Sequence, residues 1–279
     1  MNGFLLIDKN KGETSFDVVK RVRKEFGVKK VGHAGTLDPL ATGLMIVAVG
    51  EATKLLEYLL KKDKVYEVKA KFGYESDTYD AEGEISEIDT ATALDKKSVQ
   101  EVVEKSFIGE IDQVPPKYSA LKVEGKRAYK LAREGKEFVI KKRKVKVVKF
   151  EILDFNYPEV DFKVECSSGT YIRSLVHDLG REMGVGAYVQ ELRRTKIDDW
   201  VLSKKNEHSL VAIERFFQGA LSVKIDEGEF NKLVQGQFVL GKKVVQDELV
   251  FAEYQNRFVA VLENTKDGEG IKMKKRIYQ

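Results

Sequence analysis

A glycine-rich stretch, GHAGTLDPLATG from Gly32 to Gly43, contains a single carboxylate, Asp38. An aspartate before a proline can cap a helix, but Leu-Ala-Thr-Gly and then an apolar strand-like run over 44–49 follow here. That order leaves no room for an ordinary helix. Because glycines let backbone segments approach closely, the pattern favours a tight loop that presents Asp38 as a nucleophile. Such a carboxylate must stay ionised while partly buried, which a nearby cation would favour.

Two side chains far along the sequence could assist Asp38. Arg173 lies in SGTYIRS at a predicted strand-to-helix corner, and Tyr66 lies on the apolar face of the alternating strand KVYEV. Taken alone, the arginine is typical of a surface and the tyrosine of a core. His33 alone is an ordinary loop histidine.

The sequence lacks the residues that phosphate transfer, nucleotide binding, disulfide bonding and metal binding require. Position 40 is leucine, so the second acid that a phosphate-transfer aspartate needs for magnesium is missing, and there is no complete Gly-x-x-x-x-Gly-Lys-Ser/Thr loop. One cysteine, Cys166, excludes an intramolecular disulfide framework and a cysteine-cluster zinc site. The histidines at 33, 177 and 208 are too scattered to suggest a metal cage. We therefore expect neither a metal nor a cofactor.

The charge distribution is uneven although the formal net charge is only +4. Residues 117–149 contain 13 Lys or Arg and 3 Asp or Glu, whereas residues 74–110 contain 3 lysines and 11 acids. A basic block of this size is typical of a protein with a polyanionic partner, nucleic acid first among them. The alternative is a solvated strand and loop of a Lys-rich protein of thermophilic type.

The periodicity predicts an α+β fold with a mainly antiparallel sheet flanked by helices. Strand patterns cover 3–8, 44–49, 64–72, 144–155 and 160–167. A capping box of Thr14 and Asp17 begins one helix and Gly27 ends it, while Thr170 is expected to cap another. With 279 residues, we predict a large domain over 1–223, with a basic insertion at about 114–143, and a small β-rich domain over 224–279.

No apolar run approaches the length of a membrane span, and the N-terminus has no signal-peptide pattern. We therefore expect a cytoplasmic protein.

Read together, seven motifs resemble one family. GFLLIDKNKG, GHAGTLDPLATG, KVYEV, SDTYDAEG, PPKYSALK, SSGTYIRSL and ELRR occur in this order between Gly3 and about Arg194. This two-thirds of the chain resembles the TruB family of bacterial tRNA pseudouridine synthases. Asn10 departs from the family pattern, which usually has proline there, and we expect it to alter loop stiffness and not activity. The C-terminal part resembles the small PUA-like RNA-binding domain of the family in length and strand texture.

The resemblance implies isomerisation of uridine 55 in the T loop of tRNA to pseudouridine, without a cofactor. It implies Asp38 as the catalytic aspartate, Arg173 as the arginine that grips it through two parallel hydrogen bonds, and Tyr66 as the tyrosine that stacks on the uracil. The carboxylate could attack the uracil ring or the sugar C1′, or support a glycal route with Tyr66 as base. The further pocket positions that the resemblance implies are His33, which fills the space near the extruded nucleotide, and Lys9, Asp80, Tyr171 and Leu192.

The basic insertion resembles the family's thumb, which clamps the T loop. The residues expected to contact RNA, by phosphate binding or by stacking, are Lys117, Tyr118, Lys122, Lys126, Arg127, Tyr129 and Arg133. Tyr129 could instead be purely structural, packing inward from an amphipathic helix with Leu131 and Ala132. We interpret His177, Trp200 and Cys166 as structural.

The expected partner is the T stem-loop of tRNA, bound by a monomer without an obligate protein partner or a membrane. Three alternatives remain at this point. A guide-dependent relative would work inside an RNA–protein particle, but the short C-terminal domain and the lack of long basic tails argue against it. An RNA chaperone would use the thumb without Asp38. A small-molecule hydrolase lacks the expected second acid.

Overall fold

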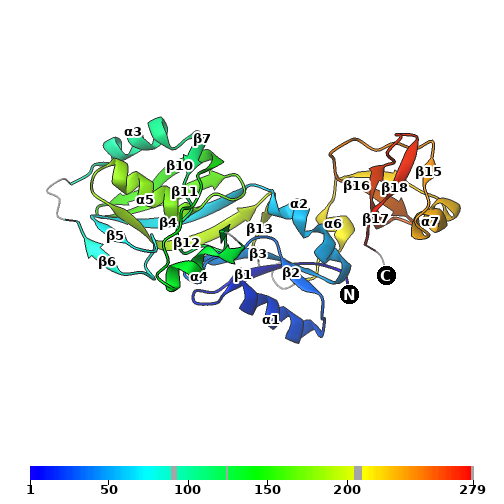
Figure 1. The fold of residues 1–279 in the computed structure, drawn as a ribbon, viewed down its shortest axis with the longest axis horizontal. Coiled ribbons are helices and arrows are strands. Elements are labelled where there is room, and N and C mark those ends of the chain that lie inside the picture. Colours follow the sequence, from blue (N-terminus) through cyan, green and yellow to red (C-terminus); the bar gives the residue numbers. More distant parts are fainter. Residues whose placement is uncertain (89–92, 124, 204–208, 278–279) are drawn as a thin grey trace.

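The computed structural model describes residues 1–88, 93–123, 125–203 and 209–277. It has a large lobe built on one sheet and a small β-rich lobe at the C-terminus (Figure 1). The predicted α+β class is confirmed. In the part of the chain that is described, no helix is long and apolar enough to cross a membrane.

The large lobe is organised by a nine-stranded sheet of order β1-β3-β12-β4-β11-β10-β7, with β2 beside β3 and β13 beside β12. All neighbours are antiparallel except β3 and β12, so the predicted mainly antiparallel sheet is confirmed. The strands are β1 (Gly3–Lys9), β2 (Val31–His33), β3 (Thr42–Val49), β4 (Lys64–Phe72), β7 (Gly109–Gln113), β10 (Arg143–Asn156), β11 (Glu159–Cys166), β12 (Ala187–Ile197) and β13 (Trp200–Val201).

Three helices share the main hydrophobic core with this sheet: α1 (Ser15–Phe26), α3 (Lys96–Ser106) and α5 (Ile172–Glu182). The predicted capping box of Thr14 and Asp17 begins α1, and Gly27, in the left-handed region, ends it. The prediction for α5 is wrong in one detail. Its N-cap is Tyr171, and the Thr170 hydroxyl donates instead to the Ser167 carbonyl, 3.0 Å away, which closes the turn before the helix.

The basic insertion leaves and re-enters the sheet at one edge. β7 ends at Gln113 and β10 starts at Arg143, and these two residues are paired across the strands. The intervening segment, called the thumb below (residues 114–142), contains β8 (Lys122–Val123), β9 (Lys126–Arg127) and α4 (Ala128–Arg133). It is therefore a loop between neighbouring strands, anchored at both ends by the sheet.

The small lobe is a five-stranded sheet of order β14-β16-β17-β18-β15 with one helix. It packs on the large lobe through aromatic rings. Phe216 stacks on Phe4 of β1 at 4.0 Å between ring centroids, and Phe217 lies 5.4 Å from Phe251 of β16. The remaining elements of the two lobes and of their connections are η1 (Gly50–Leu55), α2 (Leu56–Leu60), β5 (Tyr74–Ser76), β6 (Ile85–Glu87), α6 (Ile213–Phe216), β14 (Leu221–Lys224), α7 (Glu227–Val234), β15 (Val239–Leu240), β16 (Val250–Tyr254), β17 (Arg257–Asn264) and β18 (Gly270–Arg276).

Candidate active site

The Asp38 loop joins β2 to β3 and is held from below by backbone contacts. Ser15, the first residue of α1, donates from its hydroxyl to the Leu37 carbonyl at 3.0 Å and accepts from the Leu37 amide at 2.8 Å. The fully buried Lys9 donates from Nζ to the Pro39 carbonyl at 3.1 Å and to the Glu13 carbonyl at 2.6 Å. These contacts fix the backbone on both sides of Asp38, so the carboxylate is presented by a rigid loop.

The glycine that follows this loop near the start of β3 is required by close approach. Gly43 has a φ of +99°, and a Cβ built on it would lie 2.3 Å from the Arg194 carbonyl oxygen of the neighbouring strand. A larger residue therefore cannot stand where β3 passes β12.

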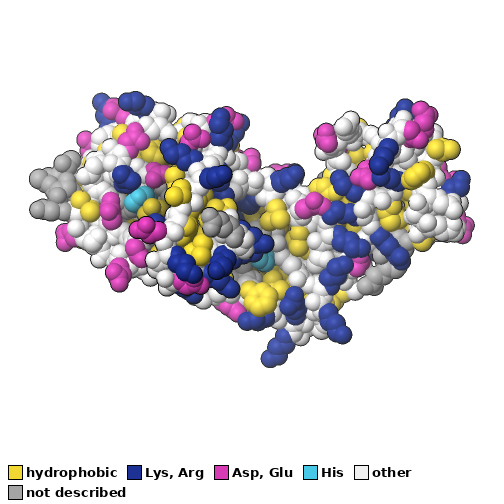
Figure 2. Space-filling model, viewed as in Figure 1, with side chains coloured by type: hydrophobic (Ala, Val, Ile, Leu, Met, Phe, Trp, Pro, Cys, Tyr) yellow, Lys and Arg dark blue, Asp and Glu magenta, His cyan; other side chains and the backbone are white. Residues whose placement is uncertain are grey.

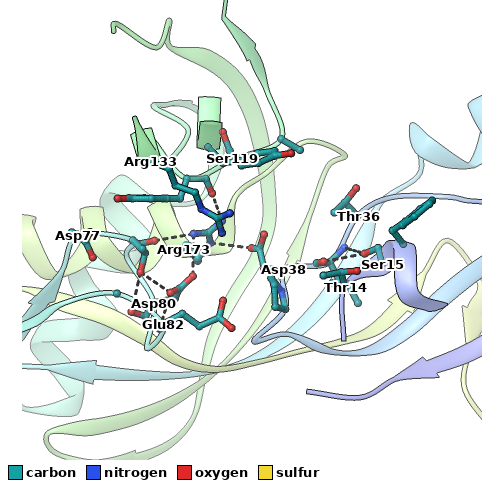
Figure 3. Close-up of a pocket in the computed structure, with 18 of the residues that line it drawn as sticks. Thr14, Ser15, Thr36, Asp38, Asp77, Asp80, Glu82, Ser119, Arg133 and Arg173 are labelled. Carbon is teal, nitrogen blue, oxygen red and sulfur yellow. Dashed lines mark hydrogen bonds and ion pairs between the residues drawn. The ribbon is translucent and has the colours of Figure 1, made fainter. Parts of the chain in front are cut away.

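Arg173 connects Asp38 to the rest of the site (Figure 3). Its Nε lies 2.9 Å from Asp38 Oδ2, and its Nη1 lies 3.0 Å from Asp80 Oδ2. Nη1 also donates to the Thr78 carbonyl and Nη2 to the Tyr118 carbonyl, each at 2.9 Å. The guanidinium is buried, so these oxygens replace its water.

This arrangement corrects the expected two-pronged grip on Asp38. The contact with Asp38 is a single ion pair, and the Nε–H does not point at the carboxylate closely enough to make a hydrogen bond. The other two nitrogens of Arg173 are taken by Asp80 and by two backbone carbonyls. Most contacts of the guanidinium therefore fix the orientation of Arg173, and Asp38 receives one charged contact.

Opposing effects act on the pKa of Asp38, and burial is the largest of them. Burial raises the pKa of the carboxyl, the Arg173 charge opposes this, and the Asp80 charge raises the pKa further. The side chain is nevertheless 33 % exposed, because it lies at the bottom of an open concavity. A carboxylate that is poorly solvated but still accessible is suited to react with a bound substrate.

Two pockets of opposite charge meet at Asp38 and Arg173. The first, of about 820 Å³, has an acidic floor and is covered by the thumb. Its charged and aromatic lining residues are Phe16, His33, Asp38, Asp77, Asp80, Glu82, Glu84, Tyr118, Tyr129, Arg133 and Arg173. The second, of about 630 Å³, is basic, and its charged and aromatic lining residues are Asp38, Lys61, Lys64, Tyr66, Lys122, Arg127, Arg143, Tyr171, Arg173 and Arg194.

The basic pocket, as we call the second one, contains Tyr66 and Leu192 on neighbouring strands. Tyr66 lies opposite Arg194 in the pairing of β4 with β12. Burial raises the pKa of Tyr66, so its phenol is protonated at neutral pH. Tyr171 lines the same pocket, and the buried Gln113 clamps its backbone by donating to the carbonyl at 2.9 Å and accepting from the amide at 2.8 Å.

Most of the predicted site residues are brought together around these two pockets. Lys9 is the exception within the pocket set, because it lies beneath the Asp38 loop and lines neither pocket. Lys117 and Lys126 are exposed on the thumb and also line neither. Tyr129 is half-buried and has the Arg133 guanidinium over its ring at 5.8 Å. Figure 2 shows Lys and Arg side chains gathered on the thumb over the middle of the large lobe.

Four cations of the basic pocket, Lys61, Lys64, Arg143 and Arg194, were missed in the sequence. Arg194 is fully buried and donates to the Leu44 carbonyl at 2.8 Å and to the Gly35 carbonyl at 3.2 Å. Strand alternation puts it on the same face as Leu192, which is the signal that could have identified it. Arg143 lies 4.3 Å over the Tyr171 ring, and burial lowers the pKa of Lys64 to about 8. The sequence around Arg143 and Lys64 shows only a basic stretch and a strand, so it did not indicate that either residue lines the pocket.

The described residues contain no group of three or more His, Cys, Asp or Glu side chains arranged to hold a metal ion. The site is instead an ion pair placed between an acidic and a basic cavity, with aromatic rings on both sides.

Comparison with solved structures identifies the fold. In fold, the chain is similar to the solved structure of a Cbf5–Nop10–Gar1 complex, at a TM-score of 0.71 and 24 % identity over 99 % of this chain and 85 % of the other. It is similar to an H/ACA RNP bound to a substrate RNA containing 2′-deoxyuridine at a TM-score of 0.72 and 22 % identity, with 99 % and 85 % covered. These likenesses show the fold of the chain.

Sequence matches are more specific. The family model described as TruB family pseudouridylate synthase (N terminal domain) matches residues 23–172, and that of the tRNA pseudouridylate synthase B C-terminal domain matches residues 173–234. The chain is 39 % identical over 274 residues to tRNA pseudouridine synthase B of Aquifex aeolicus, covering 94 % of this chain and 95 % of the relative. It is 37 % identical over 282 residues to the Clostridium tetani protein of that name, covering 96 % and 97 %. The chain therefore belongs to the TruB family.

Proposed function

We propose that this protein isomerises uridine 55 in the T loop of tRNA to pseudouridine. The observation that carries the proposal is the Asp38–Arg173 ion pair at the junction of two pockets, one of which is basic and contains Tyr66. The relatives at 37–39 % identity are named tRNA pseudouridine synthase B, which supports tRNA as the substrate.

The target nucleotide enters the basic pocket after it leaves the stack of the T loop. Lys64, Arg143 and Arg194 give this pocket the charge that attracts a phosphodiester. The uracil then lies against the rings and side chains of Tyr66 and Leu192, within reach of Asp38. Because Tyr66 is protonated at neutral pH, we assign it to ring contact and hydrogen bonding, and not to the role of a free phenolate base.

The reaction breaks the bond between N1 and C1′ and forms a bond between C5 and C1′. The C5 proton leaves and N1 gains one, so no atom is gained or lost. Asp38 supplies the carboxylate that acts on the reacting nucleotide, and Arg173 holds it in place and offsets part of its burial. Lys9 and Ser15 act through the loop backbone and are positioning residues.

The thumb supplies most of the affinity for RNA in this proposal. Lys117, Lys122 and Lys126 are exposed on it, and cations of this kind bind phosphates without sequence preference. The thumb residues Tyr118 and Tyr129 line the acidic pocket, where they can pack on exposed bases. We infer that the protein acts as a monomer on free tRNA in the cytoplasm.

The test is pseudouridine mapping on an unmodified tRNA transcript incubated with the purified protein in EDTA. We expect one new pseudouridine, at position 55, and none in a matched transcript that carries cytidine there. Modification at another position would refute the assignment of the site. No modification together with tight binding would favour a chaperone role, in which the thumb binds tRNA without chemistry at Asp38.

A further inference from the structure

We propose that Tyr79 and His177 are positioning residues that hold Arg173 in its reactive orientation. Their rings are stacked, with centroids 3.7 Å apart and planes inclined by 11°. This inference rests on the proposed function, because it assigns the two residues to the isomerisation that Asp38 and Arg173 carry out.

The stack joins the two elements that control Arg173. His177 lies on α5, four residues and about one helical turn after Arg173. Tyr79 lies between Thr78 and Asp80, and these two residues provide both oxygens that Nη1 of Arg173 contacts. The ring contact therefore sets how far the turn around Tyr79 lies from the helix that carries the arginine.

The turn is fixed on its other side by the sheet. The Val189 amide of β12 donates to the Tyr79 carbonyl at 3.0 Å, and the Ala81 amide donates to the Val189 carbonyl at 3.0 Å. These backbone bonds hold the turn to β12, and the ring stack holds it to α5. Loss of the stack frees the side of the turn that faces Arg173.

The backbone of Tyr79 is strained in the position that forms the stack. Its φ is +63°, in the left-handed region that glycine, asparagine and aspartate adopt most easily. An aromatic residue persists in this conformation only where the surroundings over-determine it. Here His177, which is buried and whose Nδ1 has no hydrogen-bond partner among the described residues, is the surface on which the ring lies.

The test exploits this strained backbone. Tyr79→Asn removes the ring but suits the left-handed conformation, so the relieved backbone strain should offset part of the lost stacking and keep the protein folded at the assay temperature. We expect its single-turnover rate of pseudouridine formation to fall about tenfold, since small misplacements of reacting groups are costly, with tRNA affinity within about twofold. His177→Leu should show the same loss, and His177→Phe, which keeps a stacking ring, should restore the rate.

Phe107→Leu is the matched control, because it reduces another aromatic contact of the large lobe, with Phe150 at 6.4 Å between ring centroids. It should lower stability and leave the rate unchanged. A wild-type rate for Tyr79→Asn or His177→Leu would overturn the inference, as would an equal loss of rate in Phe107→Leu. An inactive wild-type protein would instead refute the proposed function, so the two failures are distinguishable.

Discussion

Arg173→Lys tests whether the arginine fork, and not only its charge, is needed. Arg173 holds four oxygen atoms, one each from Asp38, Asp80, Thr78 and Tyr118. A lysine has one nitrogen with three donors, so at least one of these oxygens loses its partner. Because the four contacts are spread around a planar group, we expect two oxygens in total to lose their partner. A hydrogen bond to a charged group contributes about 1.5–3 kcal/mol. We therefore expect the free energy of unfolding to fall by about 3–6 kcal/mol.

For a protein of this size, such a loss lowers the melting temperature by about 6–24 °C. The rate should fall further than the stability implies, because a shift of about 1 Å in the Asp38 carboxylate can cost about a hundredfold. The assay is thermal unfolding followed by circular dichroism, with single-turnover pseudouridine formation measured well below the transition. Arg181→Lys, at an exposed position of the same helix, should change neither quantity. Near wild-type rate and stability in the Arg173→Lys protein would refute the reasoning.

Three further perturbations have defined outcomes. Because burial raises the pKa of Asp38, the single-turnover rate should fall on the acid side with an apparent pKa above the ordinary aspartate value of 3.8, as protonation removes the reactive carboxylate; an acid limb at or below that value would contradict this. Gly43→Ala places a Cβ against the Arg194 carbonyl at a φ of +99° and should cost about 1–3 kcal/mol or more of stability, so unchanged thermal unfolding would count against the packing described. Lys126→Ala, on the exposed surface of the thumb, should weaken tRNA binding and reduce the slope of log affinity against log salt by about one, whereas Lys97→Ala on α3 should leave both unchanged; equal slopes for the two variants would remove Lys126 from the RNA interface.

Local patterns predicted the frame of this site well. The alternation of 64–72 correctly predicted that Tyr66 faces inward from β4. The motifs around Asp38 and Arg173, read together, correctly assigned the Asp38 loop and α5 to one site. These predictions succeed because strand period and glycine spacing are local properties of the chain.

The partners of Arg173 could not be predicted in the same way. Two of them are backbone carbonyls, of Thr78 and Tyr118, whose directions depend on turns formed far away in the sequence. The sequence suggested a fork on Asp38, whereas the fork is shared with Asp80. The stack of Tyr79 on His177 likewise depends on a tyrosine in the left-handed conformation, which this residue type rarely adopts.

The most direct test of the central role of Asp38 follows the proton that leaves C5 of the target uridine. Wild-type protein and Asp38→Asn are each mixed in excess with tRNA that carries tritium at C5 of its uridines, and tritium release and tRNA binding are measured in parallel. The wild-type protein should release one equivalent per tRNA. The variant should release none yet bind tRNA with similar affinity, and it should not melt earlier at pH 7, because the raised pKa means that ionising Asp38 costs folding stability. Release by the variant at the wild-type rate would contradict the account.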